Sequence, residues 1–180
     1  MRSNSESRRF ATASLGDRAK LLLLTVGGLG LAPFAPGSFG TLGGLALALV
    51  FELLVVGRSY AFLLLGLVLL CLLAGIALGT WAERWFGKKD AGAIVLDELA
   101  GYFVTVAIIV LVSGRHPSAL GHGLAFVAFR IVDILKPWPG KLCEKAPAGL
   151  GVMLDDVVLA LYSGGAVAAL SLVFAEELLW

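Results

Sequence analysis

An uncharged run of 23 residues, 60–82, constrains the fold of this chain more than any other feature. As an α-helix rising 1.5 Å per residue, such a run crosses the roughly 30 Å hydrocarbon core of a bilayer with some tilt. The composition agrees, because 59% of the 180 residues are apolar, 15% are charged and the mean hydropathy is +0.93. Soluble domains are about 45–50% apolar and about 25% charged. The chain is therefore expected to be a membrane protein, and disorder or a disulfide-stapled mini-protein is excluded.

Four further segments are candidate membrane helices. In order of decreasing clarity they are residues 157–175, 41–56, 99–114 and 118–135. The last is ambiguous because His122, Arg130 and Asp133 lie in it. We expect an all-α, polytopic membrane bundle of about five membrane-embedded helices, with four crossings and a re-entrant helix as the alternative.

The basic residues favour five crossings. With five, twelve of the fourteen Lys and Arg residues share one side, and only Arg58 and Arg115 lie on the other. If residues 118–135 did not cross, the division would be eight against six. The positive-inside rule makes the basic side cytoplasmic. A net charge of +1 provides no long-range field to attract nucleic acid, so no nucleic-acid partner is expected.

The chain is expected to hold one domain. Residues 1–20 are predicted to be a polar flexible tail, 21–175 a single membrane-embedded domain and 176–180 a C-terminal tail. Basic residues before the apolar segment 21–31 imitate a signal peptide. The twenty polar residues are long for the first part of a signal peptide, and a candidate motif follows the apolar segment, so an interfacial or re-entrant helix is favoured. Cys71 and Cys143 form neither a disulfide framework nor a metal-binding spacing.

Acidic residues mark three places on the expected cytoplasmic side. They are Asp90 with Asp97 and Glu98, then Asp133, and then Asp155 with Asp156. Ionisable groups near hydrocarbon are costly and usually mark a pathway or a site. The alternative is that the two pairs simply begin helices, where carboxylates suit the positive end of the helix dipole.

Neighbouring carboxylates on a helix project about 100° apart, so pairs from two segments would have to converge on one ion. Oxygen ligands without His or Cys suit Mg²⁺ or Mn²⁺, and Mg²⁺ often also binds substrate phosphate. His116 and His122 fall on or toward the opposite side and are expected to be bystanders, so a zinc site is not expected.

Residues 129–139 (FRIVDILKPWP) form a second candidate motif. Arg130, Asp133 and Lys136 fall within a 120° arc of a helix that Pro137 must end. A snorkelling basic collar with Trp138 as an aromatic anchor explains Lys136, but explains the deeper Arg130 and Asp133 less well. Two cations oriented by an aspartate suit a phosphate monoester.

Residues 32–44 (APFAPGSFGTLGG) form a third motif, a Gly/Pro break at a helix start. Its glycines allow close backbone approach, and Ser38 and Thr41 offer hydroxyls, so the turn could cradle an anion on helix N–H groups. The alternative is a simple break with Ser38 or Thr41 as the N-cap. The segment lacks the Gly-Lys-Ser/Thr of a P-loop.

Four motifs, in this order, resemble the phosphatidylglycerophosphatase A family. They are residues 35–41 (APGSFGT), 94–98 (IVLDE), 129–139 (FRIVDILKPWP) and 149–156 (GLGVMLDD). The resemblance covers about residues 20–175. Ala91 and Ala148 depart from the pattern, where Pro and a second Gly are expected, but neither departure removes a polar group.

The resemblance implies a Mg²⁺-dependent hydrolase of phospholipid biosynthesis in the bacterial cytoplasmic (inner) membrane. Its expected partner is a phospholipid: it would remove the terminal phosphate of phosphatidylglycerophosphate at the cytoplasmic face and leave phosphatidylglycerol. The oligomeric state stays open, because Gly75 and Gly79 can pack helices within one chain or between chains.

We expect the carboxylates to form the catalytic and metal-binding centre. Asp97 or Glu98, together with Asp155 or Asp156, would hold Mg²⁺, and Asp133 would complete the ligands. A water activated by the metal would attack in line, with a spare carboxylate as base.

The phosphate-binding residues are expected to be Arg130, Lys136, Ser38 and Thr41. The two cations would neutralise phosphoryl oxygens as charge builds. A phospho-aspartyl intermediate is less favoured than water attack, because the sequence has no Asp-x-Asp nucleophile motif.

Parts of the sequence are compatible with two other functions. Residues 117–122 (PSALGH) faintly echo the Pro-Ser-Gly-His motif of membrane phosphatases with a His nucleophile, but the spacing is broken. A small ion-coupled transporter could use the carboxylates as a coupling site and the Gly/Pro break as a discontinuous helix. No inverted repeat is visible, and the acidic residues gather on one face, which favours the phosphatase.

Overall fold

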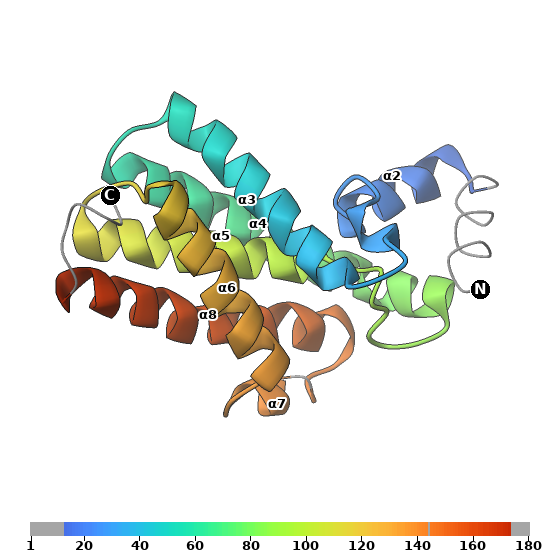
Figure 1. The fold of residues 1–180 in the computed structure, drawn as a ribbon. Helices are drawn as coiled ribbons and strands as arrows, with labels where there is room; N and C mark the ends of the chain where they lie inside the picture. Colours follow the sequence, from blue (N-terminus) through green and yellow to red (C-terminus); the bar gives the residue numbers. More distant parts are fainter. Residues whose placement is uncertain (1–12, 144, 174–180) are drawn as a thin grey trace.

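The computed structural model describes residues 13–143 and 145–173, and these form seven α-helices and one 3₁₀ turn without a β-strand (Figure 1). In chain order the elements are α2 (Leu15–Leu24), η1 (Leu29–Leu31), α3 (Pro36–Leu54), α4 (Arg58–Phe86), α5 (Leu96–Ser113), α6 (Ala119–Leu135), α7 (Gly140–Cys143) and α8 (Ala148–Val173). The predicted all-α bundle is confirmed. The predicted C-terminal tail, 176–180, and residues 1–12 of the predicted N-terminal tail lie outside the described residues.

Each of the five predicted membrane segments corresponds to one long helix. Among the described residues, four helices are long and apolar enough to cross a membrane: α3, α4, α5 and residues Gly149–Ser171 of α8. The exception is α6, which carries Arg130 and Asp133. Near its start, His122 bonds to Glu52 in the last turn of α3, and near its end Asp133 shares a cavity with Glu98 of the first turn of α5. Therefore α6 runs through the bundle from one end to the other.

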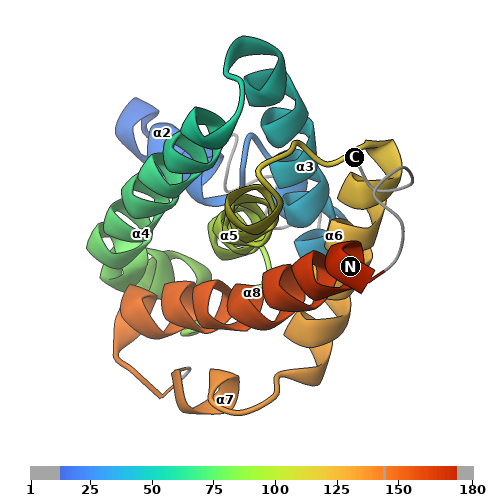
Figure 2. The same ribbon diagram turned by 90° about the vertical axis from the view of Figure 1, so that its left-hand side faces the viewer.

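The central helix is α5, which is surrounded by α3, α4, α6 and α8 (Figure 2). It is the most buried of the four candidate spans, and helices that are apolar all round are typically buried. Close packing depends on a small residue: a Cβ at Gly101 would collide with the ring of Phe129 on α6. The charged start of α5 is thereby fixed among four other helices.

Glycines also bring α8 against α4. A Cβ at Gly149 would collide with the backbone of Gly75 and lie 2.9 Å from the Cα of Gly79. On the opposite side of this contact, a Cβ at Gly75 would collide with the side chain of Met153. The Gly75-x₃-Gly79 pair thus packs two helices of the same chain, and it sets the position of the first two turns of α8.

The N-terminal segment lies beside the loop that precedes α5. Its helix α2 begins at Leu15, inside the segment predicted to be a polar tail, and the Ser14 hydroxyl caps it by accepting from the Asp17 N–H. The Val95 N–H donates to the Leu24 carbonyl at 2.9 Å. The Lys20 ammonium lies 4.8 Å from the centre of the Trp81 ring. These contacts tie the N-terminal segment to α4 and to the residues just before Asp97.

Candidate active site

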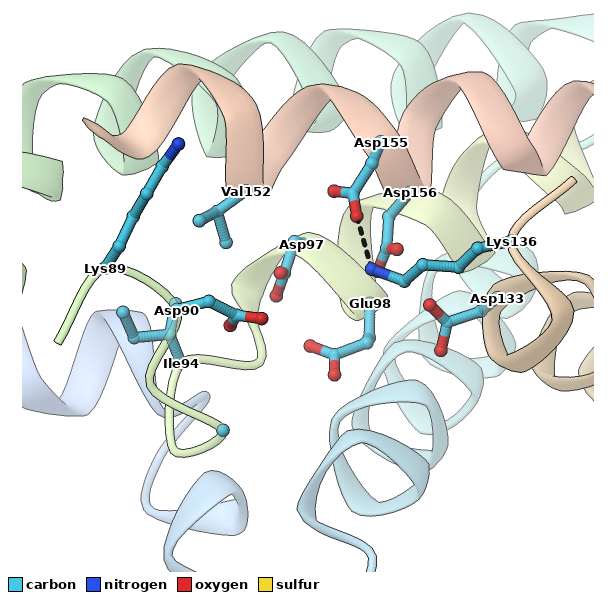
Figure 3. Close-up of a pocket in the computed structure, with 11 residues that line it drawn as sticks. Lys89, Asp90, Ile94, Asp97, Glu98, Asp133, Lys136, Val152, Asp155 and Asp156 are labelled. Carbon is cyan, nitrogen blue, oxygen red and sulfur yellow. Dashed lines mark hydrogen bonds and ion pairs between the residues drawn. The ribbon is translucent and has the colours of Figure 1, made fainter. Parts of the chain in front are cut away.

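A cavity of about 370 Å³ lies at the end of the bundle where α5 begins. Its walls come from the loop between α4 and α5, the first turn of α5, the end of α6 and the first turns of α8 (Figure 3). The lining residues are Lys89, Asp90, Gly92, Ile94, Asp97, Glu98, Asp133, Lys136, Val152, Asp155 and Asp156. We call it the acidic cavity, because its lining holds six carboxylates and two ammonium groups.

Three of these carboxylates converge. One carboxylate oxygen from each of Asp97, Glu98 and Asp156 lies within 4.8 Å of the other two. Asp97 and Glu98 occupy the first turn of α5, where the helix dipole favours them. Asp156 lies about two turns into α8, whose first turn holds no acidic residue. Helix-dipole stabilisation therefore accounts for the first pair and leaves the position of Asp156 unexplained.

Two of the converging carboxylates carry buried oxygens that are not satisfied. Among the described residues, Asp97 Oδ1 and Glu98 Oε2 have no hydrogen-bond partner. A buried polar atom without a partner costs about 1–3 kcal/mol, and more when it is charged. A donor set made of oxygen alone fits a hard divalent cation such as Mg²⁺ or Mn²⁺. The three carboxylates therefore fit such a cation, which would satisfy the orphaned oxygens.

The remaining aspartate of α8 faces a lysine. The Lys136 ammonium donates to Asp155 Oδ2 at 2.7 Å. Lys136 is the C-cap of α6, in the left-handed region with φ of 43°. A residue with a side chain adopts this conformation at a cost. The turn at Lys136 aims its side chain back toward α8, into the acidic cavity (Figure 3).

Arg130 lies next to the lining of the acidic cavity. Its Nη1 pairs with Asp133 Oδ2 at 2.6 Å. On its other side is the first turn of α3, where a Cβ at Gly37 would lie 3.1 Å from Arg130 Nη1 and would collide with Glu98 Oε1. The motif at residues 35–41 thus reaches the site through the bare backbone of Gly37.

The two predicted hydroxyl residues lie farther along α3. The Thr41 hydroxyl is buried and donates to the Gly37 carbonyl at 3.0 Å. The Ser38 N–H donates to the carbonyl of Ala35, the N-cap of α3. Within the described chain, neither Ser38 nor Thr41 contributes to the lining of the acidic cavity. The structure therefore brings together the five predicted acids and Lys136, with Arg130 beside them, and leaves both hydroxyls outside.

Sequence reasoning missed a second lysine. Lys89, in the loop between α4 and α5, lines the acidic cavity and donates from Nζ to the Ala146 carbonyl at 2.7 Å. Its neighbour Asp90 also lines the cavity. The run Lys88-Lys89-Asp90, just before the 94–98 motif, was the available signal. A loop conformation cannot be predicted from such a run, so the sequence did not show which of the three residues faces inward.

Both histidines lie in a separate polar cluster at the other end of α3. His122 Nε2 is 2.9 Å from Glu52 Oε2, and its Nδ1 is 2.9 Å from the Tyr102 hydroxyl. His116 Nδ1 lies 3.3 Å from Glu52 Oε1. We call Glu52, Tyr102, His116 and His122 the histidine network. Because both histidines are held here, a His nucleophile in the acidic cavity is not supported.

Comparisons with known proteins agree with the motifs. The family model for phosphatidylglycerophosphatase A matches residues 22–171. A phosphatidylglycerophosphatase A of Haemophilus influenzae is 38% identical over 143 residues, which are 78% of this chain and 82% of the relative. One of Escherichia coli is 34% identical over 149 residues, covering 79% of this chain and 78% of the relative.

A third relative carries a different name. A putative phosphatidylinositol-3-phosphatase of Bacteroides thetaiotaomicron is 31% identical over 143 residues, covering 79% of this chain and 87% of the relative. No solved structure matches the chain significantly. The similarity therefore comes from sequence alone, and it spans every helix that lines the acidic cavity.

Proposed function

The chain belongs to the phosphatidylglycerophosphatase A family and is a phosphatase, and from this premise we propose that it hydrolyses the terminal phosphate of phosphatidylglycerophosphate. The products would be phosphatidylglycerol and inorganic phosphate. The third relative's name indicates a related chemistry: its substrate would also be a lipid whose headgroup polyol carries a phosphomonoester. The shared substrate class is a phosphomonoester on the headgroup of a membrane lipid.

The observation that carries this proposal is the convergence of Asp97, Glu98 and Asp156 in a cavity that also holds Lys136. These three carboxylates would hold Mg²⁺, since the unpartnered oxygens of Asp97 and Glu98 and the oxygen-only donor set of all three fit it. When bound, Mg²⁺ supplies positive charge against the phosphoryl oxygens and makes water more acidic.

The chain's own residues then bind the phosphate and move a proton. Lys136 lies in the cavity, where its ammonium group would bind a phosphoryl oxygen. Arg130 would act through Asp133, with which it pairs, by holding that carboxylate in place. Asp133 and Asp155 line the cavity outside the converging trio and are the candidate bases.

The reaction is a displacement at phosphorus. The oxygen of water forms the new bond to phosphorus, and the bond from phosphorus to the glycerol oxygen breaks. The proton taken from water by Asp133 or Asp155 ends on the glycerol oxygen that leaves. The products, phosphatidylglycerol and inorganic phosphate, thus form without a covalent enzyme intermediate.

We assign the reaction to phospholipid biosynthesis at the cytoplasmic face of a bacterial inner membrane. Lys88, Lys89 and Lys136 lie at the end of the bundle that holds the acidic cavity, whereas Arg58 follows α3 and Arg115 follows α5 at the other end. The positive-inside rule supports a cytoplasmic position for the lysine-rich end. Acyl chains would stay in the leaflet while the headgroup enters the cavity.

Phosphate release tests the proposed function. Detergent-purified protein is incubated with phosphatidylglycerophosphate, once with Mg²⁺ and once with a chelator. We expect release with Mg²⁺, loss of release with the chelator and recovery when Mg²⁺ is returned. No release by folded protein under any condition would refute the activity, and flux in liposomes without phosphate release would indicate the transporter instead.

A further inference from the structure

The segment before α3 folds as a hairpin. The chain runs toward the bundle along α2, turns at residues 25–28 and returns through η1 and residues 32–35 to the start of α3 (Figure 1). We call residues 15–35 the N-terminal hairpin and residues 25–32 its tip. With ten residues, α2 is about 15 Å long, so the hairpin is too short to cross a bilayer. Its contacts place it relative to the membrane.

The tip lies beside α3, about two turns into that helix. A Cβ at Gly43 would lie 2.7 Å from Leu29 Cδ1 and 3.2 Å from Val26 Cγ1, so both side chains pack against bare backbone there. Gly43 is about 10 Å along α3 from its first residue, Pro36. The 19 residues of α3, a candidate membrane span, measure about 28 Å and match the roughly 30 Å hydrocarbon core. The tip is therefore level with the hydrocarbon rather than with the headgroups.

The tip satisfies its own backbone donors. All eight N–H groups from Thr25 to Ala32 donate to carbonyls of residues 21–29, at 2.7–3.3 Å. The Thr25 hydroxyl is buried, donates to the Leu21 carbonyl and accepts from the Gly28 N–H. An irregular turn in water does not need this, because water supplies missing partners, whereas hydrocarbon supplies none. The hydrogen bonding of the tip therefore suits a turn that is surrounded by acyl chains.

The outer surface of the hairpin is apolar. Residues 21–51 carry no charge. Leu21 and Leu24 face the protein. The large apolar side chains of the hairpin that are exposed beyond Lys20 are those of Leu22, Leu23, Leu29 and Phe34. Exposed Leu42 continues this surface onto α3. The Lys20 ammonium lies beside the ring of Trp81, a residue type that is enriched at membrane interfaces, so the charged end of α2 suits the headgroup level.

We propose that the N-terminal hairpin is a re-entrant element whose tip is seated among the acyl chains of the leaflet on the side of the acidic cavity. The opposite side of the hairpin braces the loop before Asp97. The Val95 N–H donates to the Leu24 carbonyl, and a Cβ at Gly30 would collide with the Ala93 carbonyl. The hairpin thus joins the lipid to the loop that leads into the acidic cavity.

Spin labelling of the full chain measures the depth of the tip. Cys71→Ala and Cys143→Ala give a background without cysteine, into which Leu23→Cys or Leu29→Cys is introduced. Each variant is labelled with a nitroxide and reconstituted into vesicles of phosphatidylcholine and phosphatidylglycerol. The collision rate of the label is measured with oxygen, which concentrates in hydrocarbon, and with a nickel chelate, which stays in water.

Two further positions serve as controls. Leu70→Cys is exposed near the middle of α4 and reports hydrocarbon, and Lys88→Cys is exposed in the loop after α4 and reports water. We expect Leu23→Cys and Leu29→Cys to give an oxygen-to-nickel collision ratio close to that of Leu70→Cys and several-fold above that of Lys88→Cys. A ratio equal to that of Lys88→Cys would overturn the proposal by placing the tip in water. Slow collisions with both reagents would also overturn it, because protein, such as a second copy of the chain, would then cover the tip.

A label at the start of α2 tests the direction of entry. Leu15 is exposed and lies about 12 Å from Leu23 along the helix, so Leu15→Cys should give a lower ratio than Leu23→Cys. Equal ratios would overturn the re-entrant geometry. Each variant should keep the Tm of the cysteine-free background in detergent, and Leu22→Cys, with similar exposure, replaces Leu23→Cys if that variant unfolds more easily. None of these measurements depends on phosphatase activity.

Discussion

The acidic cavity and the histidine network lie at opposite ends of the same bundle, and both are built from ionisable side chains among apolar helices. Gly37, beside the cavity, and Glu52, in the network, are about 22 Å apart along α3. In the network both ring nitrogens of His122 and both oxygens of Glu52 have partners. In the cavity, Asp97 and Glu98 carry buried oxygens for which the described residues supply no hydrogen bond.

The difference lies in what each cluster does for stability. A closed network satisfies its buried groups and links α3, α5 and α6, so it stabilises the bundle. Carboxylates that face one another repel, and the buried oxygens of Asp97 and Glu98 have no hydrogen-bond partner among the described residues. On our proposal, the cluster whose buried polar atoms have partners is structural, and the cluster with unpartnered buried oxygens is functional. Three substitutions test this comparison.

The largest effect is expected for Asp156→Asn in the cavity. It removes one of the three converging carboxylates, so kcat should fall about a thousandfold. In the presence of a chelator its Tm should rise, because like charges no longer face one another, and the rise of Tm on adding Mg²⁺ should disappear. Phosphate release and thermal unfolding in detergent, each with and without Mg²⁺, check both expectations. Full turnover by this variant would show that Asp156 is not needed for catalysis.

An intermediate effect is expected for Gly37→Ala. The added Cβ would collide with Glu98 Oε1 and crowd Arg130, so kcat/KM should fall about ten- to a hundredfold through displacement of a site carboxylate. Gly66→Ala on α4 is the matched control, because a Cβ there meets nothing within 4 Å. Steady-state kinetics of the two variants checks this, and equal activity would show that the first turn of α3 does not position the site.

The smallest effect is expected for Glu52→Gln in the histidine network. An amide cannot accept from both His116 and His122 as a carboxylate does, so the free energy of unfolding should fall by about 1 kcal/mol. Phosphate release should not change, since Glu52 is far from the cavity. Denaturation in mixed micelles checks the expected loss of stability, and the phosphate-release assay checks that activity is unchanged. A loss of turnover equal to that of Asp156→Asn would erase the distinction between the two clusters.

Much of the fold followed from hydropathy, because lipid-facing helices need long apolar runs. All five predicted segments are helices, and α4 extends beyond the predicted 60–82 at both ends, from Arg58 to Phe86. Helix α2, which begins at Leu15 inside the predicted polar tail, was not visible in the sequence. Its charged first turns lack the apolar run that makes membrane helices visible in a sequence.

The site was predicted in outline. Sequence reasoning expected one carboxylate from each acidic pair to converge, whereas the structure brings together both Asp97 and Glu98 with Asp156 and directs Asp155 to Lys136. Whether Asp155 or Asp156 joins the converging carboxylates depends on the rotation of α8 about its axis. That rotation is set by contacts such as Gly149 against Gly75, which no local pattern encodes.

The sequence by itself determined that this chain is a helical membrane protein with acidic residues gathered at one end, because hydropathy and charge act along the chain. The tertiary structure decided which of those acids converge, that Gly37 packs against Glu98 and Arg130, and that Lys89 lines the acidic cavity. These features are contacts between residues far apart in the sequence. They are fixed by how helices pack, and packing depends on the shapes of both partners at once.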